Sequence, residues 1–242
     1  MFRITLIVIV MLSGFAEAFS QNKKQVNFPS LDGIEITADL YQRSERSPFV
    51  ILCHQARYSR GEYIETAPKL NEMGFSCLAV DLRSGDEVNG ITNRTHQVAM
   101  KKGKPVNYVD AEQDILAAIN YISVMHQAPD IILVGSSYSA SLVLKIAVEH
   151  ERVKAVAAFS PGEYFGSYMK IKPSLKSLQK PTFVTSSKAE STKLKKFVDE
   201  VAAAQIFVPQ KMGAHGSKVL WSTHKDQEEY WLAFAEFMNS LK

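Results

Sequence analysis

The chain has 242 residues, of which 46% are hydrophobic and 22% charged; this is ordinary for a globular protein and excludes a disordered chain, a collagen or a coiled coil. The formal net charge is only +3. Lysines concentrate between residues 170 and 225, but no interleaved aromatic residues or nucleic-acid motif accompany them, so we expect a solvated surface and no nucleic-acid partner.

The first residues have the layout of a secretory signal peptide. Arg3 precedes an uncharged apolar run, residues 4–15, and a small-x-small cleavage pattern ends at Ala18. The apolar run is too short to span a bilayer comfortably. We therefore expect removal of the signal peptide, residues 1–18, and a single domain over residues 19–242. The mature protein is expected to be exported, periplasmic or secreted, without stable membrane insertion; a retained anchor is the alternative.

Strand and helix patterns alternate along the rest of the chain. Residues 26–41 alternate polar and apolar positions around an Asp-Gly pair, which predicts an antiparallel hairpin. Continuous apolar runs predict buried parallel strands, and helical spacing separates them. The predicted strands are 49–53, 77–80, 131–134, 153–159, 182–185 and 205–208, and the predicted helices are 62–74, 109–122, 139–150 and 226–241. This order predicts an α/β fold with a mostly parallel central sheet flanked by helices and an N-terminal antiparallel hairpin.

Two cysteines, Cys53 and Cys77, lie in neighbouring predicted strands. Cys53 is at the exit of one strand and Cys77 at the entrance of the next, so they should lie at opposite edges of a parallel sheet. A disulfide requires Cα atoms within about 7 Å. We therefore expect two buried free thiols.

A Gly-Ser-Ser-Tyr-Ser segment, residues 135–139, connects a buried strand to a helix. This is the context of a nucleophile elbow, a sharp turn that needs small residues two before and two after the reactive serine. Gly135 meets this requirement, and Ser139 is small although Gly is usual there. Ser137 is the candidate nucleophile. The alternative is that Ser136 or Ser137 only caps the helix.

A serine nucleophile needs a base, and the base needs an orienting group. In open α/β sheets the ligand site lies at the carboxyl ends of the strands. His215 lies in a Gly-flanked loop between the last strand and the last helix and is the main candidate for the base, with His224 as the alternative. Glu190 is the only carboxylate in the loop after residues 182–185 and is the candidate acid; the alternative is a solvated glutamate beside two lysines.

An oxyanion hole requires two backbone N–H groups. One is expected from Tyr138, the residue after the candidate nucleophile. The other is expected from the loop after residues 49–53, where Ala56 is the main candidate and Gln55 the alternative. His54 stands at the start of this loop, and we expect it to hydrogen-bond the backbone there.

The stretch between residues 159 and 182 is too short to form a large lid, so we expect an open site. Gln55, Tyr164 and Phe165 are the candidate substrate contacts. Packing of the two aromatic rings onto the sheet is an equal alternative.

Four segments of the chain, in this order, resemble the α/β-hydrolase family. They are the strand exit at His54, AVDLRSG at 79–85, GSSYSA at 135–140 and GAHG at 213–216. From residue 26 onward the chain is most similar to the small dienelactone-hydrolase-like esterases. The resemblance implies the α/β-hydrolase fold and a serine hydrolase that cleaves small carboxylic esters through an acyl-enzyme, with no metal or organic cofactor.

Some positions depart from the family pattern. Many relatives have Gly where Gln55 stands and Asp where Glu190 stands. The Cys nucleophile of dienelactone hydrolases themselves is absent, so their substrate is not implied. Other functions on the same scaffold stay open: a catalytically inactive binding protein, an acyltransferase or a peptidase.

Overall fold

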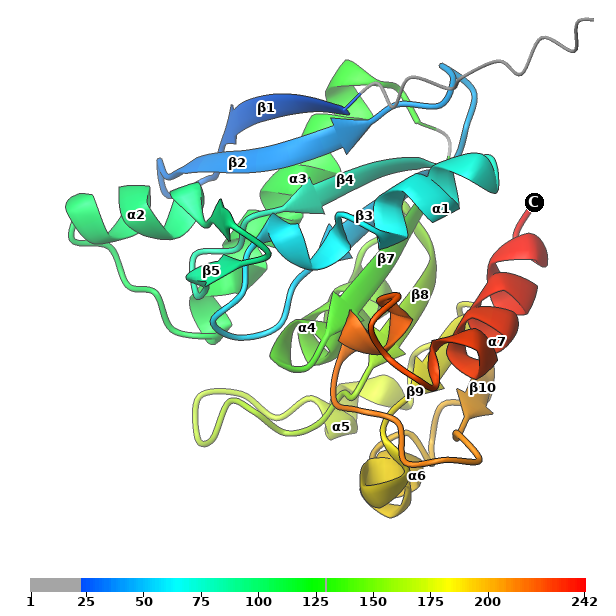
Figure 1. The fold of residues 1–242 in the computed structure, drawn as a ribbon. Coiled ribbons are helices and arrows are strands. Elements are labelled where there is room, and N and C mark those ends of the chain that lie inside the picture. Colours follow the sequence, from blue (N-terminus) through cyan, green and yellow to red (C-terminus); the bar gives the residue numbers. More distant parts are fainter. Residues whose placement is uncertain (1–22, 129) are drawn as a thin grey trace, which may run out of the picture.

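The computed structural model describes residues 23–128 and 130–242, so the expected signal peptide, residues 1–18, lies outside the described residues. An eight-stranded sheet organises the described chain, in the order β1-β2-β4-β3-β7-β8-β9-β10 (Figure 1). The pairs β1–β2 and β2–β4 are antiparallel, and all the other neighbours in this sheet are parallel. The predicted α/β fold with an N-terminal antiparallel hairpin is confirmed.

The strands are short and mostly buried. The main sheet contains β1 (Lys23–Pro29), β2 (Glu35–Tyr41), β3 (Phe49–Cys53), β4 (Ser76–Val80), β7 (Ile131–Ser136), β8 (Val153–Phe159), β9 (Thr182–Thr185) and β10 (Ala204–Phe207). A second, two-stranded sheet pairs β5 (Glu87–Val88) with β6 (Ile91–Thr92).

Helices connect the strands and cover both faces of the main sheet. The α-helices are α1 (Thr66–Glu72), α2 (Arg94–Lys101), α3 (Glu112–Met125), α4 (Tyr138–Glu149), α5 (Lys172–Leu175), α6 (Ser191–Phe197) and α7 (Gln227–Asn239). The 3-10 helices are η1 (Arg60–Tyr63), η2 (Val109–Ala111), η3 (Lys188–Glu190) and η4 (Ser217–Leu220).

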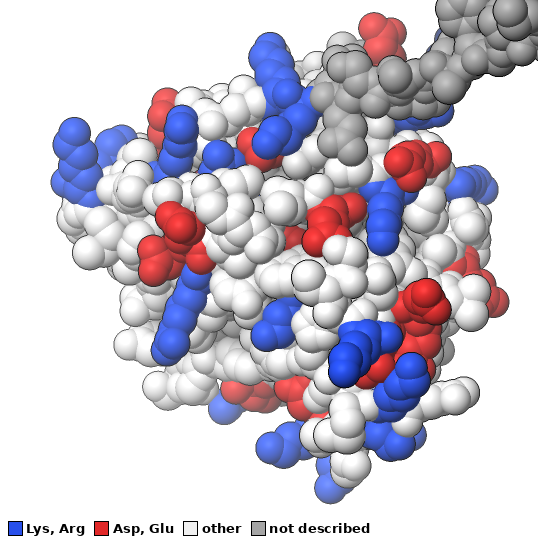
Figure 2. Space-filling model, viewed as in Figure 1, with Lys and Arg blue, Asp and Glu red and all other residues white. Residues whose placement is uncertain are grey.

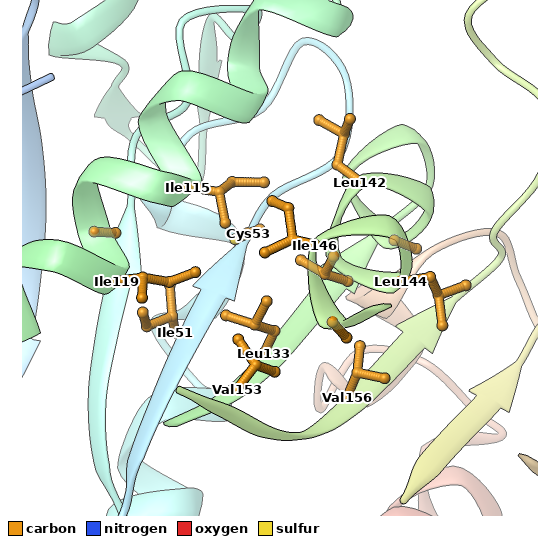
Figure 3. Close-up of a cluster of buried hydrophobic side chains, with 14 of the residues drawn as sticks. Ile51, Cys53, Ile115, Ile119, Leu133, Leu142, Leu144, Ile146, Val153 and Val156 are labelled. Carbon is orange, nitrogen blue, oxygen red and sulfur yellow. The ribbon is translucent and has the colours of Figure 1, made fainter. Parts of the chain in front are cut away.

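Alternation along the central strands divides the buried side chains into two cores. On β3, Ile51 and Cys53 join the core under α3 and α4, whereas Val50 and Leu52 join the core under α1 and α7. Figure 3 shows the first core, with side chains from β3, β7, α3 and α4 in contact. Because successive side chains of a strand point to opposite faces, a strand covered on both faces must be apolar at every position.

Most of the predicted elements are present, with shifted ends. The pattern over residues 62–74 divides into η1 and the shorter α1, and the helix predicted from Val109 begins as the 3-10 helix η2. Helices α2 and α5 and the β5–β6 hairpin were not predicted. A local signal for α2 exists, because the Asn93 side chain caps it by accepting a hydrogen bond from the His96 N–H at 2.8 Å.

The two cysteines are free and buried, as predicted. The register of β3 and β4 keeps the two thiols apart, because Cys77 pairs with Val50 and Cys53 pairs with Val80.

On the surface, positive and negative side chains intermingle on the face seen in Figure 2, in keeping with the small net charge. Within the described part of the chain, no helix combines the length and the apolar character that a membrane crossing requires.

Candidate active site

The turn between β7 and α4 is strained at Ser137, which has φ 60° and ψ −122°. A positive φ is uncommon for a residue with a side chain and persists only where the surroundings enforce it. Gly135 makes the turn possible: a Cβ atom there would lie 2.6 Å from the Ala140 Cα and from the Ser139 carbonyl oxygen. The segment at residues 135–139, called the nucleophile turn below, therefore has the tight backbone approach that an elbow requires.

Ser139 stands where a second Gly is usual, and hydrogen bonds satisfy its hydroxyl in the tight turn. Its Oγ donates to the Cys53 carbonyl oxygen at 2.7 Å and accepts from the Ser136 N–H at 2.9 Å. Ser139 is fully buried, so these bonds replace water that the hydroxyl has lost. The departure from the family pattern thus links β3 to the nucleophile turn.

The structure brings the side chains of Ser137, His215 and Glu190 together. Ser137 Oγ lies 2.7 Å from His215 Nε2, and His215 Nδ1 lies 2.5 Å from Glu190 Oε1. With the imidazole proton on Nδ1, Ser137 donates to Nε2 and His215 donates to the carboxylate. The alternative that Ser137 caps α4 is wrong, because its side chain makes no capping hydrogen bond.

Glu190 belongs to a local network that holds its carboxylate. Its Oε2 accepts from the Ser187 N–H at 3.1 Å, from Ser187 Oγ at 2.8 Å and from Ser160 Oγ at 3.0 Å. Burial raises the pKa of Glu190, but the hydrogen bonds from His215 and Ser187 outweigh it and lower the pKa to about 2. Glu190 is therefore a bound carboxylate and not a solvated surface glutamate.

His215 lies in the segment between β10 and η4, residues 208–216, called the base loop below. Its backbone is fixed on both sides: Gly213 N–H donates to Asp226 at 3.0 Å, and Gly216 N–H donates to Ser160 Oγ at 3.0 Å. Gly213 has φ 61°, and a Cβ atom there would lie 1.9 Å from the Tyr230 hydroxyl. His224, the alternative base, is not among the described hydrogen-bond partners of Ser137 or Glu190.

The segment after β3, residues 54–59, is called the oxyanion loop below. In the described structure, neither the Ala56 N–H nor the Tyr138 N–H donates a hydrogen bond to another residue. The Gln55 N–H, by contrast, donates to Glu62 Oε2 at 2.7 Å. The fallback donor Gln55 is therefore occupied, and Ala56 and Tyr138 are the amides left for an oxyanion.

His54 holds the oxyanion loop, as predicted. Its Nε2 accepts from the Leu82 N–H at 2.9 Å, so the ring proton is on Nδ1, which donates to the Gln55 carbonyl oxygen at 2.8 Å. The ring is fully buried, and this burial lowers the pKa of His54 to about 4 despite the backbone bonds. His54 is thus a neutral side chain that holds the backbone of this loop by hydrogen bonds, and it does not act as a base.

The candidate substrate contacts have different environments. Tyr164 lies between two cavities and donates from its hydroxyl to the Ser160 carbonyl oxygen at 2.7 Å. Phe165 is only 3% exposed and belongs to the core, although it borders one cavity. Gln55 points its Oε1 at Gly216, where a Cβ atom would lie 2.3 Å away, and this oxygen has no hydrogen-bond partner among the described residues.

The cavity beside the triad has a volume of about 650 Å³. Its walls include His215, Glu190 and Tyr164. Three lysines of α5 and α6 also line it: Lys172, Lys193 and Lys196. The second cavity, about 500 Å³, is lined by two segments, residues 106–109 and 164–168, which include three tyrosines.

Three polar residues of the site were given no role by sequence reasoning. Ser160 and Ser187 hold the carboxylate of Glu190, and Glu62 lies buried beneath the nucleophile turn, accepting from Ser136 Oγ at 2.8 Å. Only Ser187 has a local signal, the Ser-x-x-Glu capping box that it forms with Glu190. Among the described residues, no cluster of three or more His, Cys, Asp or Glu side chains could hold a metal ion.

Comparison with solved structures gives the same fold in proteins of low sequence identity. An esterase from Pyrococcus furiosus superposes with a TM-score of 0.71 at 17% identity, over 91% of this chain and 93% of that one. A dienelactone hydrolase from Anabaena variabilis gives 0.68 at 14% identity, over 90% and 97%. The protein Est1E from Butyrivibrio proteoclasticus, with ferulic acid bound, gives 0.68 at 16% identity, over 89% and 98%.

Comparison at the sequence level is decisive for the family. No curated protein sequence matches the chain. The family model described as Dienelactone hydrolase family matches residues 36–205, more than half of the 242 residues and most of the parallel sheet, including the nucleophile turn. The chain therefore belongs to the dienelactone hydrolase family.

Proposed function

We propose that the protein is an exported serine hydrolase that cleaves small carboxylic esters through an acyl-enzyme. The observation that carries the proposal is the chain of contacts from Ser137 Oγ through His215 to Glu190, at 2.7 Å and 2.5 Å. This is the arrangement of nucleophile, base and orienting acid that acyl transfer requires. The esterases among the structural neighbours support the same class of reaction.

In the first half of the reaction, His215 Nε2 takes the proton of Ser137 as Oγ attacks the ester carbonyl carbon. The carbonyl π electrons move to its oxygen, and the N–H groups of Ala56 and Tyr138 stabilise the oxyanion. Glu190 stabilises the imidazolium charge. The tetrahedral intermediate collapses, the alcohol leaves with the proton from Nε2, and the acyl group stays on Oγ.

In the second half, water replaces the alcohol. His215 takes a proton from water as its oxygen attacks the acyl carbon, the oxyanion forms again at the same two amides, and Ser137 leaves as an alkoxide that regains the proton from Nε2. The carboxylic acid is released. Every proton is returned, so the cycle needs only the ester and water.

Reaction with a fluorophosphonate and turnover of p-nitrophenyl acetate test this proposal. Ser137→Ala should lose labelling and lower kcat by about three orders of magnitude or more, because triad members act as a unit. Ser136→Ala is the matched control and should keep labelling. A wild-type protein that is neither labelled nor active would instead support an inactive binding protein. Product analysis with a competing alcohol or a peptide substrate separates hydrolysis from acyl transfer and peptide cleavage.

Esters of aromatic acids are the finer substrate class that we propose. Tyr108, Tyr164 and Tyr168 contribute rings to the cavity of about 500 Å³, and the neighbour Est1E holds ferulic acid. Methyl ferulate should be cleaved with a lower KM than methyl acetate, and Tyr108→Ala should remove that difference, since a stacked ring contributes about 0.5–1.5 kcal/mol. Equal KM values in the wild type would contradict the aromatic preference and leave the ester hydrolase proposal standing.

Export belongs to the proposal as well and rests on the N-terminal sequence pattern. Mass spectrometry of protein recovered from the host envelope or medium should find a chain that begins near Phe19. An intact Met1 on membrane-bound protein would contradict it.

A further inference from the structure

Glu62 is a buried carboxylate to which the proposed reaction gives no role. It lies in η1 with no exposed surface, and no Lys, Arg or His of the described chain forms an ion pair with it. Burying an unpaired charge costs several kcal/mol unless hydrogen bonds replace the lost hydration. Burial raises the pKa of Glu62, and hydrogen bonds from Ser217, Gln55 and Ser136 oppose that rise.

These three donors come from three segments that are far apart in the chain. Gln55 N–H donates to Glu62 Oε2 at 2.7 Å, while the hydroxyls of Ser136 and Ser217 donate to Oε1 at 2.8 Å and 2.6 Å. The Ser217 N–H also donates to Ser136 Oγ at 2.8 Å, which links two of the donors directly. One carboxylate therefore joins the oxyanion loop, the nucleophile turn and the residue that follows the base loop.

Each of these donors lies within two residues of a group in the proposed reaction. Ser136 directly precedes Ser137, and Ser217 follows His215 by two residues. Gln55 precedes Ala56 and is held on both sides, because Glu62 binds its N–H and His54 Nδ1 binds its carbonyl oxygen at 2.8 Å. In a trans peptide the Ala56 N–H points opposite to that carbonyl, so this hold sets its direction.

We propose that Glu62 is a positioning residue for catalysis, whose carboxylate holds the oxyanion loop, the nucleophile turn and the base loop in register. The inference rests on the proposed function and deepens it. A residue that only stabilised the fold would change melting temperature without changing the rate at each folded site.

Glu62→Gln separates these two roles. The amide keeps the shape of the side chain, removes the charge and can present an NH₂ group to hydroxyls that now donate to Oε1. Oxyanion donors act mainly on the transition state, so displacing them lowers kcat more than it changes KM. We expect kcat to fall about 10- to 100-fold with KM within about threefold, since small misplacements cost up to about 100-fold.

The measurement is kcat and KM for p-nitrophenyl acetate, with active sites counted by fluorophosphonate titration and melting temperature recorded in parallel. Asp39→Asn is the matched control: Asp39 is also a buried carboxylate, and it holds η1 through Arg60 Nε at 3.0 Å without touching the three segments. It should lower the melting temperature and leave kcat per active site within about twofold, as expected of a structural ion pair. Wild-type kcat in Glu62→Gln would overturn the inference.

Two further readouts keep the test decisive. If Glu62→Gln does not fold, Ser217→Ala removes one donor and leaves the carboxylate. This variant should lower kcat about tenfold at unchanged KM, and wild-type kcat in Ser217→Ala would overturn the inference.

Amide hydrogen exchange of residues 54–58 needs no turnover. Faster exchange in Glu62→Gln is expected, and unchanged protection would overturn the inference. A wild type without labelling or turnover would refute the proposed function, while the exchange result would still decide whether Glu62 holds the oxyanion loop.

Discussion

His215 Nδ1 lies 2.5 Å from Oε1 of Glu190, which ends the 3-10 helix η3 and leads into α6. The place of Glu190 at the end of η3 explains how a glutamate carboxylate reaches His215 at a position where relatives commonly have aspartate. Glu190 is the last residue of a capping box begun by Ser187, so its backbone is tied to the helix start. Its side chain has one more methylene than aspartate, and the carboxylate reaches the imidazole while Oε2 stays bound to Ser187.

Replacing Glu190 tests this arrangement. Glu190→Gln should keep the fold and lower kcat by about 10³- to 10⁴-fold, because an amide can favour the wrong imidazole tautomer and cannot balance the imidazolium charge. Glu190→Asp should recover part of the rate. Steady-state turnover of p-nitrophenyl acetate measures both.

Asp199→Asn is the control for Glu190. Asp199 lies just after α6 and pairs with Lys172 at 2.8 Å on the surface. The substitution should change the free energy of unfolding by at most about 0.5 kcal/mol and leave kcat unchanged. Near-normal turnover in Glu190→Gln would show that another group or water orients His215.

Gly135→Ala should disrupt the nucleophile turn. The added Cβ would meet backbone atoms of Ser139 and Ala140 at 2.6 Å, and neither can move without shifting β7 against α4. We expect the free energy of unfolding to fall by about 1–3 kcal/mol or more, measured by chemical denaturation. Gly162→Ala is the matched control, since its Cβ would make ordinary 3.4 Å contacts with Tyr164. Equal stability of the two variants would contradict the close approach at Gly135.

His54 predicts a specific loss of stability at acidic pH. The folded pKa is about 4 and the unfolded value 6.5. Between these values the unfolded chain binds more protons than the folded one. The free energy of unfolding that neutral His54 contributes is therefore fully present above pH 6.5 and is lost as the pH falls toward 4. The full change for one such group is about 3 kcal/mol.

Denaturation of the wild type and of His54→Gln over this pH range checks the prediction. The variant should have a lower stability near neutral pH and a shallower pH dependence. His126→Gln is the comparison: burial lowers the pKa of His126 too, but that side chain is only partly buried, so its effect on the slope should be smaller. An identical slope in the wild type and in His54→Gln would exclude His54 as its source.

The two thiols should not react in the folded protein. Cys53 and Cys77 have no exposed surface, and burial raises the pKa of both thiols well above the usual range. A thiol reagent such as Ellman's reagent should label neither cysteine under native conditions and both in denaturant. Rapid native labelling of one thiol would show that its strand opens locally.

The α/β class, the succession of strands and helices along the chain and the turn at Ser137 could be predicted from the sequence alone. These features depend on local regularities: apolar runs for strands covered on both faces, helical spacing between them, and small residues around a tight turn. The residue types and chain order of Ser137, Glu190 and His215 were also readable, because they follow the ends of predicted strands. Helix α2 was missed although Asn93 caps its start, because most of its residues are polar and the sequence there has no apolar run.

Which polar groups share hydrogen bonds depends on the tertiary structure. Glu62 and Ser217 are 155 positions apart, and no spacing rule connects them; they meet because β3 and β7 are neighbours in the sheet and the base loop folds over their ends. The occupation of the Gln55 N–H by the Glu62 carboxylate is likewise visible only in the tertiary structure, and it favours the Ala56 N–H as the proposed amide donor. Hydrogen-bond geometry depends on distances of a few tenths of an ångström, which packing of the whole sheet sets and the sequence pattern does not encode.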